Sequence, residues 1–95
     1  MGKVEKILTL HPEGKKGVSI AKNKYDTIKE FILNTLKEKT TITYKELNEL
    51  ATKELSETFE GKVGWYLVTV KLDLEARNII KRIPKTSPHQ IKLTK

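Results

Sequence analysis

The sequence predicts an α+β fold in which a three-helix core lies between an amino-terminal and a carboxy-terminal β-hairpin. Hydrophobic residues alternate near both ends of the chain, and they recur at helical spacing through its middle. Within residues 64–80, a helical pattern stops at Asn78 and alternation begins. The order β-β-α-α-α-β-β is typical of a winged helix-turn-helix-like domain, in which the second hairpin is the wing.

We expect a single domain over residues 1–95, because a chain of 95 residues has room for one modest core. Residues 1–21 are assigned to the amino-terminal hairpin, 22–78 to the three helices and 79–95 to the wing. The chain has no cysteine, no apolar run near the roughly 18 residues that span a bilayer, and no signal-peptide pattern. We therefore expect a cytoplasmic protein that does not enter a membrane.

The first hairpin is predicted from two alternating segments that flank a turn-rich loop at residues 11–17. Val4, Leu8 and Leu10 share one face of the first strand, and together with Val18 and Ile20 they could cover an apolar side of the third helix. Alternation resumes at residues 18–20. These two strands would pair around the loop.

The first two helices have separate start signals. The first begins near Lys24, and Asn23, or failing that Ser19, is the expected cap. Before the second helix, Thr43 and Glu46 have the spacing of a capping box. A short strand at residues 41–42 is expected just ahead of it.

The third helix has apolar residues on two opposite sides. One set should pack on the first two helices: Val63, Leu67, Val70 and Leu74. The opposite set is Trp65, Thr69, Leu72 and Ala76, with Val68 beside it. A helix that reads a DNA groove needs donors, acceptors and cations on that second side. An apolar side requires burial instead, under the amino-terminal hairpin or against another subunit.

Residues 61–80 carry a specific motif, Gly64-Trp65-Tyr66 followed by Thr69-Val70-Lys71-Leu72-Asp73-Leu74-Glu75-Ala76 and Arg77. In this motif, in His11-Pro12 ahead of Gly14-Lys15, and in Tyr25, the chain resembles a family of small bacterial proteins of unknown function with a predicted winged-helix fold. The chain departs from the usual winged-helix pattern at Asn78, where glycine is more common. Asparagine also adopts a left-handed helix cap, so the turn is retained. The resemblance implies a fold and no activity.

Residues that could carry catalysis or hold a metal are few, and we expect neither an enzyme, nor a cofactor, nor a small-molecule substrate. His11 and His89 lie in proline-containing turns and are interpreted as solvated. Glu13 is the one candidate metal ligand near His11, which is too few for a metal site. Asp73 and Glu75 are expected on different faces of the third helix, each in a surface salt bridge.

The charge distribution supports a first hypothesis, binding to double-stranded DNA. The net charge is +7, and residues 61–95 carry eight basic and two acidic side chains. Lysine outnumbers arginine 17 to 2, which favours phosphate contacts over the reading of bases. The candidate nucleic-acid-binding residues are Lys62, Tyr66, Arg77, Lys81, Arg82, Lys85 and Lys92.

The second hypothesis is a protein-interaction or self-association module. It uses the second apolar side of the third helix, with Trp65 and Leu72 as contact residues for a protein partner or a homodimer. The exposure of these two side chains distinguishes the hypotheses. Burial under the amino-terminal hairpin would leave the wing as the binding element, whereas exposure would indicate a partner surface.

Overall fold

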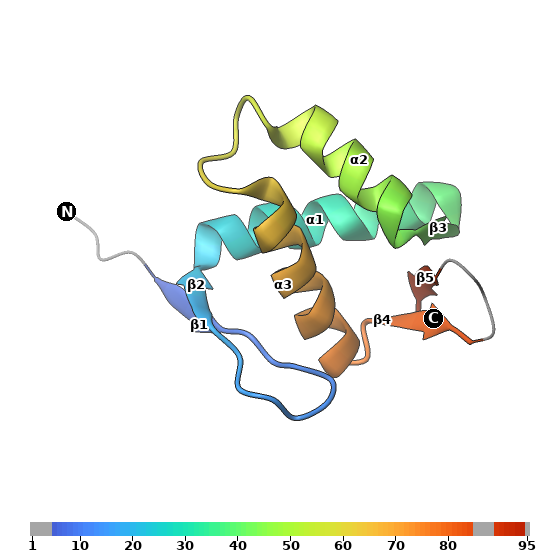
Figure 1. Ribbon diagram of the computed structural model, residues 1–95, viewed down its shortest axis with the longest axis horizontal. Helices are drawn as coiled ribbons and strands as arrows, with labels where there is room; N and C mark the ends of the chain where they lie inside the picture. The colour runs from blue at the N-terminus through green and yellow to red at the C-terminus, as the bar shows by residue number, and fades with distance from the viewer. Residues whose placement is uncertain (1–4, 85–88, 95) are drawn as a thin grey trace.

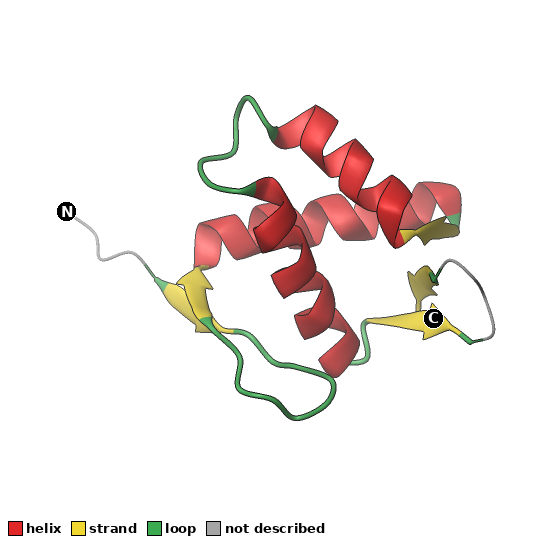
Figure 2. Ribbon diagram, viewed as in Figure 1, coloured by secondary structure: helices red, strands yellow, loops and turns green. Residues whose placement is uncertain are grey.

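A computed structural model describes residues 5–84 and 89–94, and these residues form an α+β fold with three helices and two small antiparallel sheets (Figures 1 and 2). In chain order the elements are β1 (Lys6–Leu8), β2 (Ser19–Ala21), α1 (Lys22–Lys39), β3 (Thr41–Thr43), α2 (Tyr44–Leu55), α3 (Val63–Ala76), β4 (Ile80–Ile83) and β5 (Gln90–Leu93). Helix α3 crosses in front of α1, between the β1–β2 hairpin and the β4–β5 hairpin (Figure 1). This arrangement is compatible with a winged-helix-like domain.

The second sheet joins the carboxy-terminal hairpin to the middle of the chain. Its strand order is β3-β5-β4, and Ile42 pairs with Ile91 while Arg82 pairs with Ile91 from the other side. The predicted short strand at residues 41–42 is confirmed and is one residue longer, Thr41–Thr43. Facing residues of paired antiparallel strands lie on the same side of the sheet. Ile42, Ile80 and Ile91 therefore face the helices, and all three are buried.

The core contains side chains from every helix and from the three-stranded sheet. The predicted inward side of α3 is confirmed, because Leu67, Val70 and Leu74 are fully buried and Val63 nearly so. The other fully or almost fully buried apolar side chains are Ile20, Tyr25, Ile28, Ile32, Leu36, Ile42, Leu47, Ala51, Ile80 and Ile91. Spacings of three and four residues place one stripe of each helix in this core.

The helix ends agree with the sequence at two places and differ at one. The capping box of α2 is confirmed, since the Glu46 amide donates to the Thr43 hydroxyl over 3.1 Å. Asn78 has a φ of 61° and follows α3 as its left-handed cap. The Ile79 amide there donates to the Leu74 carbonyl over 2.9 Å. The expected cap at Asn23 is wrong, because α1 already begins at Lys22 and has no side-chain cap.

The amino-terminal hairpin forms as predicted and Ile20 of its second strand is buried, but the expected apolar face of its first strand points outward. Leu8 and Leu10 are 60% and 42% exposed, whereas Ile7 is half-buried and Thr9 is buried. Val4 lies outside the described residues. The Thr9 hydroxyl donates to the Val18 carbonyl and accepts from the Val18 amide, so the inward position satisfies polar groups of the backbone rather than adding to the apolar core.

Candidate interaction surfaces on α3 and the wing

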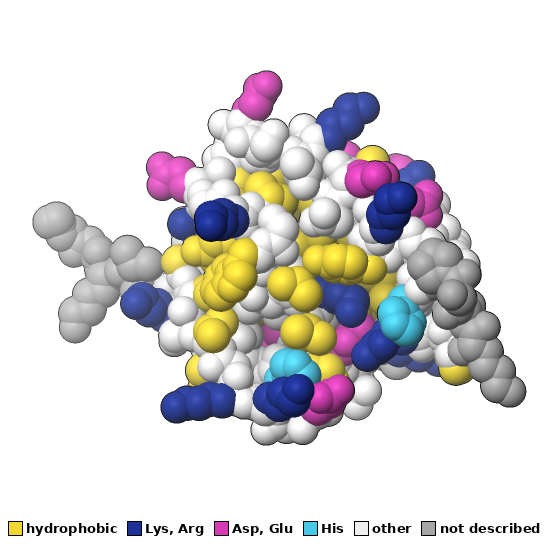
Figure 3. All heavy atoms as spheres, in the orientation of Figure 1, with side chains coloured by type: hydrophobic (Ala, Val, Ile, Leu, Met, Phe, Trp, Pro, Cys, Tyr) yellow, Lys and Arg dark blue, Asp and Glu magenta, His cyan; other side chains and the backbone are white. Residues whose placement is uncertain are grey.

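The outward side of α3 is only partly covered in this chain. We call it the outer face of α3 and define it by Trp65, Val68, Thr69, Leu72 and Ala76. Trp65 is 46% exposed and the other four side chains are half-buried. The sequence left open whether the amino-terminal hairpin or another subunit buries this side. In the structure the hairpin does not bury it. Hydrophobic side chains gather over α3 and its surroundings in the space-filling view (Figure 3).

Asp73 is fully buried, so the expected surface salt bridge at this residue is wrong. Its carboxylate accepts a hydrogen bond from the Leu10 amide over 2.8 Å and another from the Tyr25 hydroxyl. Arg77 Nε donates to both carboxylate oxygens over 3.0 and 2.9 Å. A charged carboxylate is stable in an interior only when such donors surround it. Asp73 thus connects α3 with α1 and with the amino-terminal hairpin.

The same contacts explain two shifted pKa values. Burial raises the pKa of the Tyr25 hydroxyl well above its ordinary value of 10, and the hydrogen bond to Asp73 raises it further. The hydrogen bond to Asp73 also raises the pKa of Arg77. Both raised pKa values mean that the protonated forms of Tyr25 and Arg77 are favoured beside the buried carboxylate of Asp73.

Glu75 was also expected at the surface, and this too is wrong. Its side chain is 7% exposed, and one of its oxygens lies 3.1 Å from Lys71 Nζ and 3.8 Å from Arg82 Nε. Lys71 is itself nearly buried, with its ammonium 5.4 Å from the centre of the Tyr44 ring. This second charged cluster lies along the opposite flank of α3 from Asp73, and it ties the helix to the wing strand β4.

The wing presents two lysines side by side on its outward face. Lys81 pairs with Lys92 across strands β4 and β5, and the alternation of the strands directs both away from the core. Like charges in directly facing positions destabilise a sheet slightly. Arg82 points the other way, toward Glu75, and its Nη1 is 3.3 Å from Nε2 of His89. Lys85 lies outside the described residues.

The predicted nucleic-acid residues therefore do not form one continuous cationic surface within the part of the chain that the structure describes. Lys62 is exposed at the start of α3, whereas Arg77 is bound to Asp73 at the other end of the helix. Tyr66 is half-buried, with its ring centre 5.1 Å from that of Phe59 and 4.9 Å from that of Trp65.

Sequence reasoning missed Lys24 as a surface residue of this region. Its Nζ lies 5.2 Å from the Tyr66 ring centre and 5.9 Å from that of Phe59, within the usual range of a cation–π contact. No pattern in the sequence relates residue 24 to residues 59 and 66, because the contact depends on how α1 packs beside the loop before α3. The exposed Leu10 and Val18 were missed for a similar reason.

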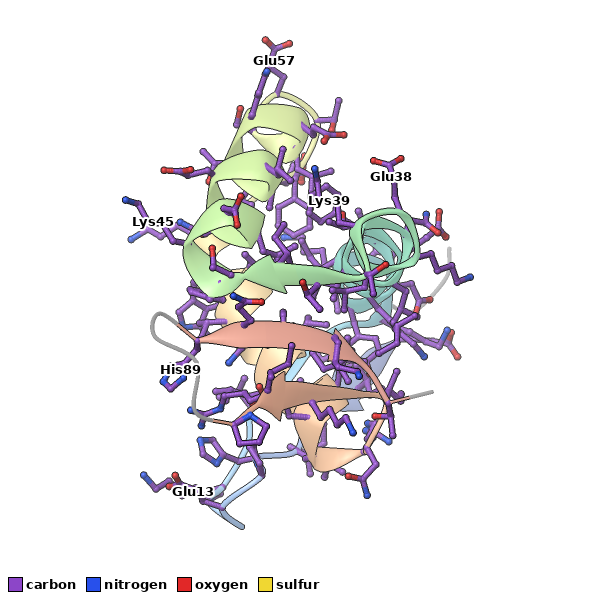
Figure 4. All side chains as sticks on the ribbon, turned by 90° about the vertical axis from the view of Figure 1, so that its right-hand side faces the viewer. Glu13, Glu38, Lys39, Lys45, Glu57 and His89 are labelled. Atoms are coloured by element: carbon purple, nitrogen blue, oxygen red, sulfur yellow. The ribbon has the colours of Figure 1, made fainter. Side chains whose placement is uncertain are left out.

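Neither histidine contributes to a metal-binding cluster in residues 5–84 and 89–94, where no group of three or more histidine, aspartate or glutamate side chains converges. His11 Nδ1 accepts from the Glu13 amide over 3.1 Å, which is a local turn contact. His89 is exposed at the end of the wing (Figure 4). Among the described helices, none combines the length and the apolar character needed to cross a membrane.

Comparisons with known proteins place the chain in a family without giving it an activity. Neither the curated proteins nor the solved structures contain a significant match. The family comparison does find one, over residues 6–91, which include every described helix and most of the wing. On this match the chain belongs to DUF6958, a family of unknown function.

Proposed function

We propose that this chain is a non-enzymatic, cytoplasmic, winged-helix-like domain whose outer face of α3 binds a protein. The observation that carries the proposal is the 46% exposure of Trp65 on a helix side that also presents Val68 and Leu72. Large aromatic side chains that remain accessible are enriched in protein interfaces. The winged-helix assignment is supported by a three-stranded sheet formed by β3 and the hairpin that follows the third helix.

The reading of DNA bases by α3 is a poorer fit to the same face. Direct readout requires side-chain donors, acceptors and cations directed toward the base edges. The Thr69 hydroxyl donates to the Trp65 carbonyl of its own helix over 2.8 Å. Lys71, the one lysine within α3, is nearly buried and paired with Glu75. The remaining outer-face side chains are apolar.

Site-specific photo-crosslinking in cells tests the proposal. A benzophenone amino acid at Thr69 replaces a partly exposed outer-face residue and leaves Trp65 in place. We expect a discrete protein adduct that disappears in the Trp65→Ala background. The matched control position is Glu38, which is exposed near the end of α1 (Figure 4). Equal adducts from both positions, no adduct, or nuclease-sensitive adducts from Thr69 would refute the proposal.

A second candidate function is phosphate-backbone binding by the wing, and the facing pair Lys81 and Lys92 supports it. Two cations held side by side on an outward sheet face could each neutralise a phosphate. Duplex binding followed by fluorescence anisotropy should then weaken steeply from about 50 to 200 mM salt. The Lys81→Gln/Lys92→Gln variant should lower the salt dependence. Binding that is unchanged over this range would exclude the wing as a duplex-binding element.

A further inference from the structure

The exposed apolar side chains of the described residues are concentrated in two neighbouring elements. The large hydrophobic residues with the greatest exposure are Leu8, Leu10, Val18 and Trp65. The first three belong to the amino-terminal hairpin and the fourth to α3. The Leu10 amide donates a hydrogen bond to Asp73 of α3, so this part of the hairpin lies against the carboxy-terminal half of the helix. Figure 3 shows hydrophobic side chains on this face of the molecule, over α3 and toward the hairpin.

Two lysines lie beside the tryptophan on this surface. Lys24 is 5.2 Å from the Tyr66 ring centre, and that ring is in edge contact with Trp65. Lys62 precedes α3 directly and is exposed, less than one helical turn before Trp65. Within the described part of the chain, neither ammonium group lies within ion-pair distance of a carboxylate. Both can therefore accept an anionic partner without breaking an existing pair.

The charge of the surrounding segments has the same sign. Residues 5–25 and 61–72, which supply the hairpin and most of α3, contain seven lysines and two glutamates, although Lys22 and Lys71 are paired with Asp26 and Glu75 outside these segments. One of those glutamates, Glu13, is already paired with Lys15 at 3.2 Å. A second copy that docked symmetrically through this surface would bring two patches of the same positive charge together. Charge complementarity instead favours a partner that carries carboxylates around its apolar contacts.

We propose that the outer face of α3, together with Lys24 and Lys62, binds an acidic amphipathic segment of another protein. Its apolar side chains pack on Trp65 and Leu10, and its carboxylates pair with Lys24 and Lys62. The inference rests on the proposed protein-binding function and adds the chemical class of the partner. A helix laid on an apolar surface presents its contact side chains at spacings of three, four and seven residues, and acidic positions between them face the lysines.

Trp65 provides a direct readout because it is the single tryptophan of the chain. The probe is a tryptophan-free amphipathic peptide of about 16 residues, with leucine and phenylalanine at helical spacing and glutamate elsewhere. One control peptide carries lysine in place of every glutamate, and the other has the same composition in scrambled order. We expect a saturable blue shift of Trp65 emission with the acidic amphipathic peptide. Both control peptides should bind with an affinity at least about tenfold lower than that of the acidic peptide.

Charge reversal on the protein tests the role of the two lysines. Lys24→Glu/Lys62→Glu should weaken binding of the acidic peptide roughly tenfold and should shift the preference toward the lysine peptide. The matched control is Lys39→Glu/Lys53→Glu, which alters the net charge equally at two exposed positions of α1 and α2. It should retain the acidic preference. Circular dichroism melts verify that each variant is folded.

The possible failures are distinguishable. Equal binding of the acidic and lysine peptides, or no effect of the Lys24→Glu/Lys62→Glu change, overturns the inference about charge. If Thr69 still gives a Trp65-dependent protein adduct, the proposed protein-binding function stands without the inference about charge. A doubled mass in light scattering that Trp65→Ala abolishes would identify a second copy as the occupant and would also overturn the acidic-partner inference. Absence of any Thr69 adduct in the protein that retains Trp65 would refute both the proposed function and the acidic-partner inference.

Discussion

Replacing Asp73 by alanine removes the acceptor on which three parts of the fold converge. Tyr25 is 3% exposed, and its hydroxyl would remain buried without that partner, as would the Leu10 amide. Hydrogen bonds to a charged acceptor contribute roughly 1.5–3 kcal/mol each, so the two together contribute about 3–6 kcal/mol. The Arg77 side chain is 35% exposed and can be rehydrated, so its pair adds at most about 1 kcal/mol. A domain of this size has a free energy of unfolding of roughly 5–15 kcal/mol.

Urea denaturation followed by far-ultraviolet circular dichroism measures how much Asp73→Ala lowers the free energy of unfolding. The matched control is Asp26→Ala, which removes an exposed aspartate from an ion pair of the same spacing, with Lys22 at 2.9 Å. That control should change the free energy of unfolding by less than about 0.5 kcal/mol. Asp73→Asn should fall between the two, since one amide oxygen can still accept. A loss below about 1 kcal/mol for Asp73→Ala would refute the view that this carboxylate stabilises the fold.

Four further predictions concern single positions. Leu74→Ala should lower the free energy of unfolding by roughly 2–5 kcal/mol, because Leu74 is fully buried; a thermal melt without a shift would contradict this. Thr40→Gly should raise it by about 1 kcal/mol in urea titrations, because Thr40 has a φ of 67°, a conformation that is strained for a β-branched residue. In Gly17→Ala, the added Cβ would lie 1.7 Å from the Thr9 carbonyl oxygen, so the hairpin loop should open and its amides should exchange faster with deuterium; unchanged exchange would contradict the contact. The raised pKa of Tyr25 implies a contribution to stability that is complete below pH 10 and is lost as pH rises above it, because the Tyr25 hydroxyl ionises first in the unfolded chain. When the free energy of unfolding is measured at about pH 9 to 11, Tyr25→Phe should make its fall with pH less steep.

Local signals in the sequence predicted most of the elements correctly. The spacing of Thr43 and Glu46 located the start of α2, because a capping box involves residues only three positions apart. Asn78 located the end of α3, because few residues adopt a left-handed conformation easily. The start of α1 was placed wrongly at Asn23, since α1 begins without a side-chain cap and is held by tertiary packing.

The surfaces were harder to predict, because periodicity shows that two sides of a helix differ without showing what covers them. Trp65 and Leu72 were recognised as a second apolar side, and their covering was left open between the hairpin and another subunit. The first strand of the hairpin turned out to face the other way, with Leu8 and Leu10 outward, while Ile20 of the second strand is buried. A shift of one residue in a strand reverses every side chain, so a short strand with an imperfect pattern carries little information about its face.

Periodicity and contacts within a few residues were sufficient to predict the order of the elements, the inward side of α3, the capping box of α2 and the left-handed cap at Asn78. The burial of Asp73, in contrast, follows from tertiary contacts. Its partners lie at residues 10, 25 and 77, and a carboxylate can be buried only when donors from distant segments meet it. The same holds for the outer face of α3. Its apolar side chains are evident in the sequence, but their exposure depends on where the hairpin folds.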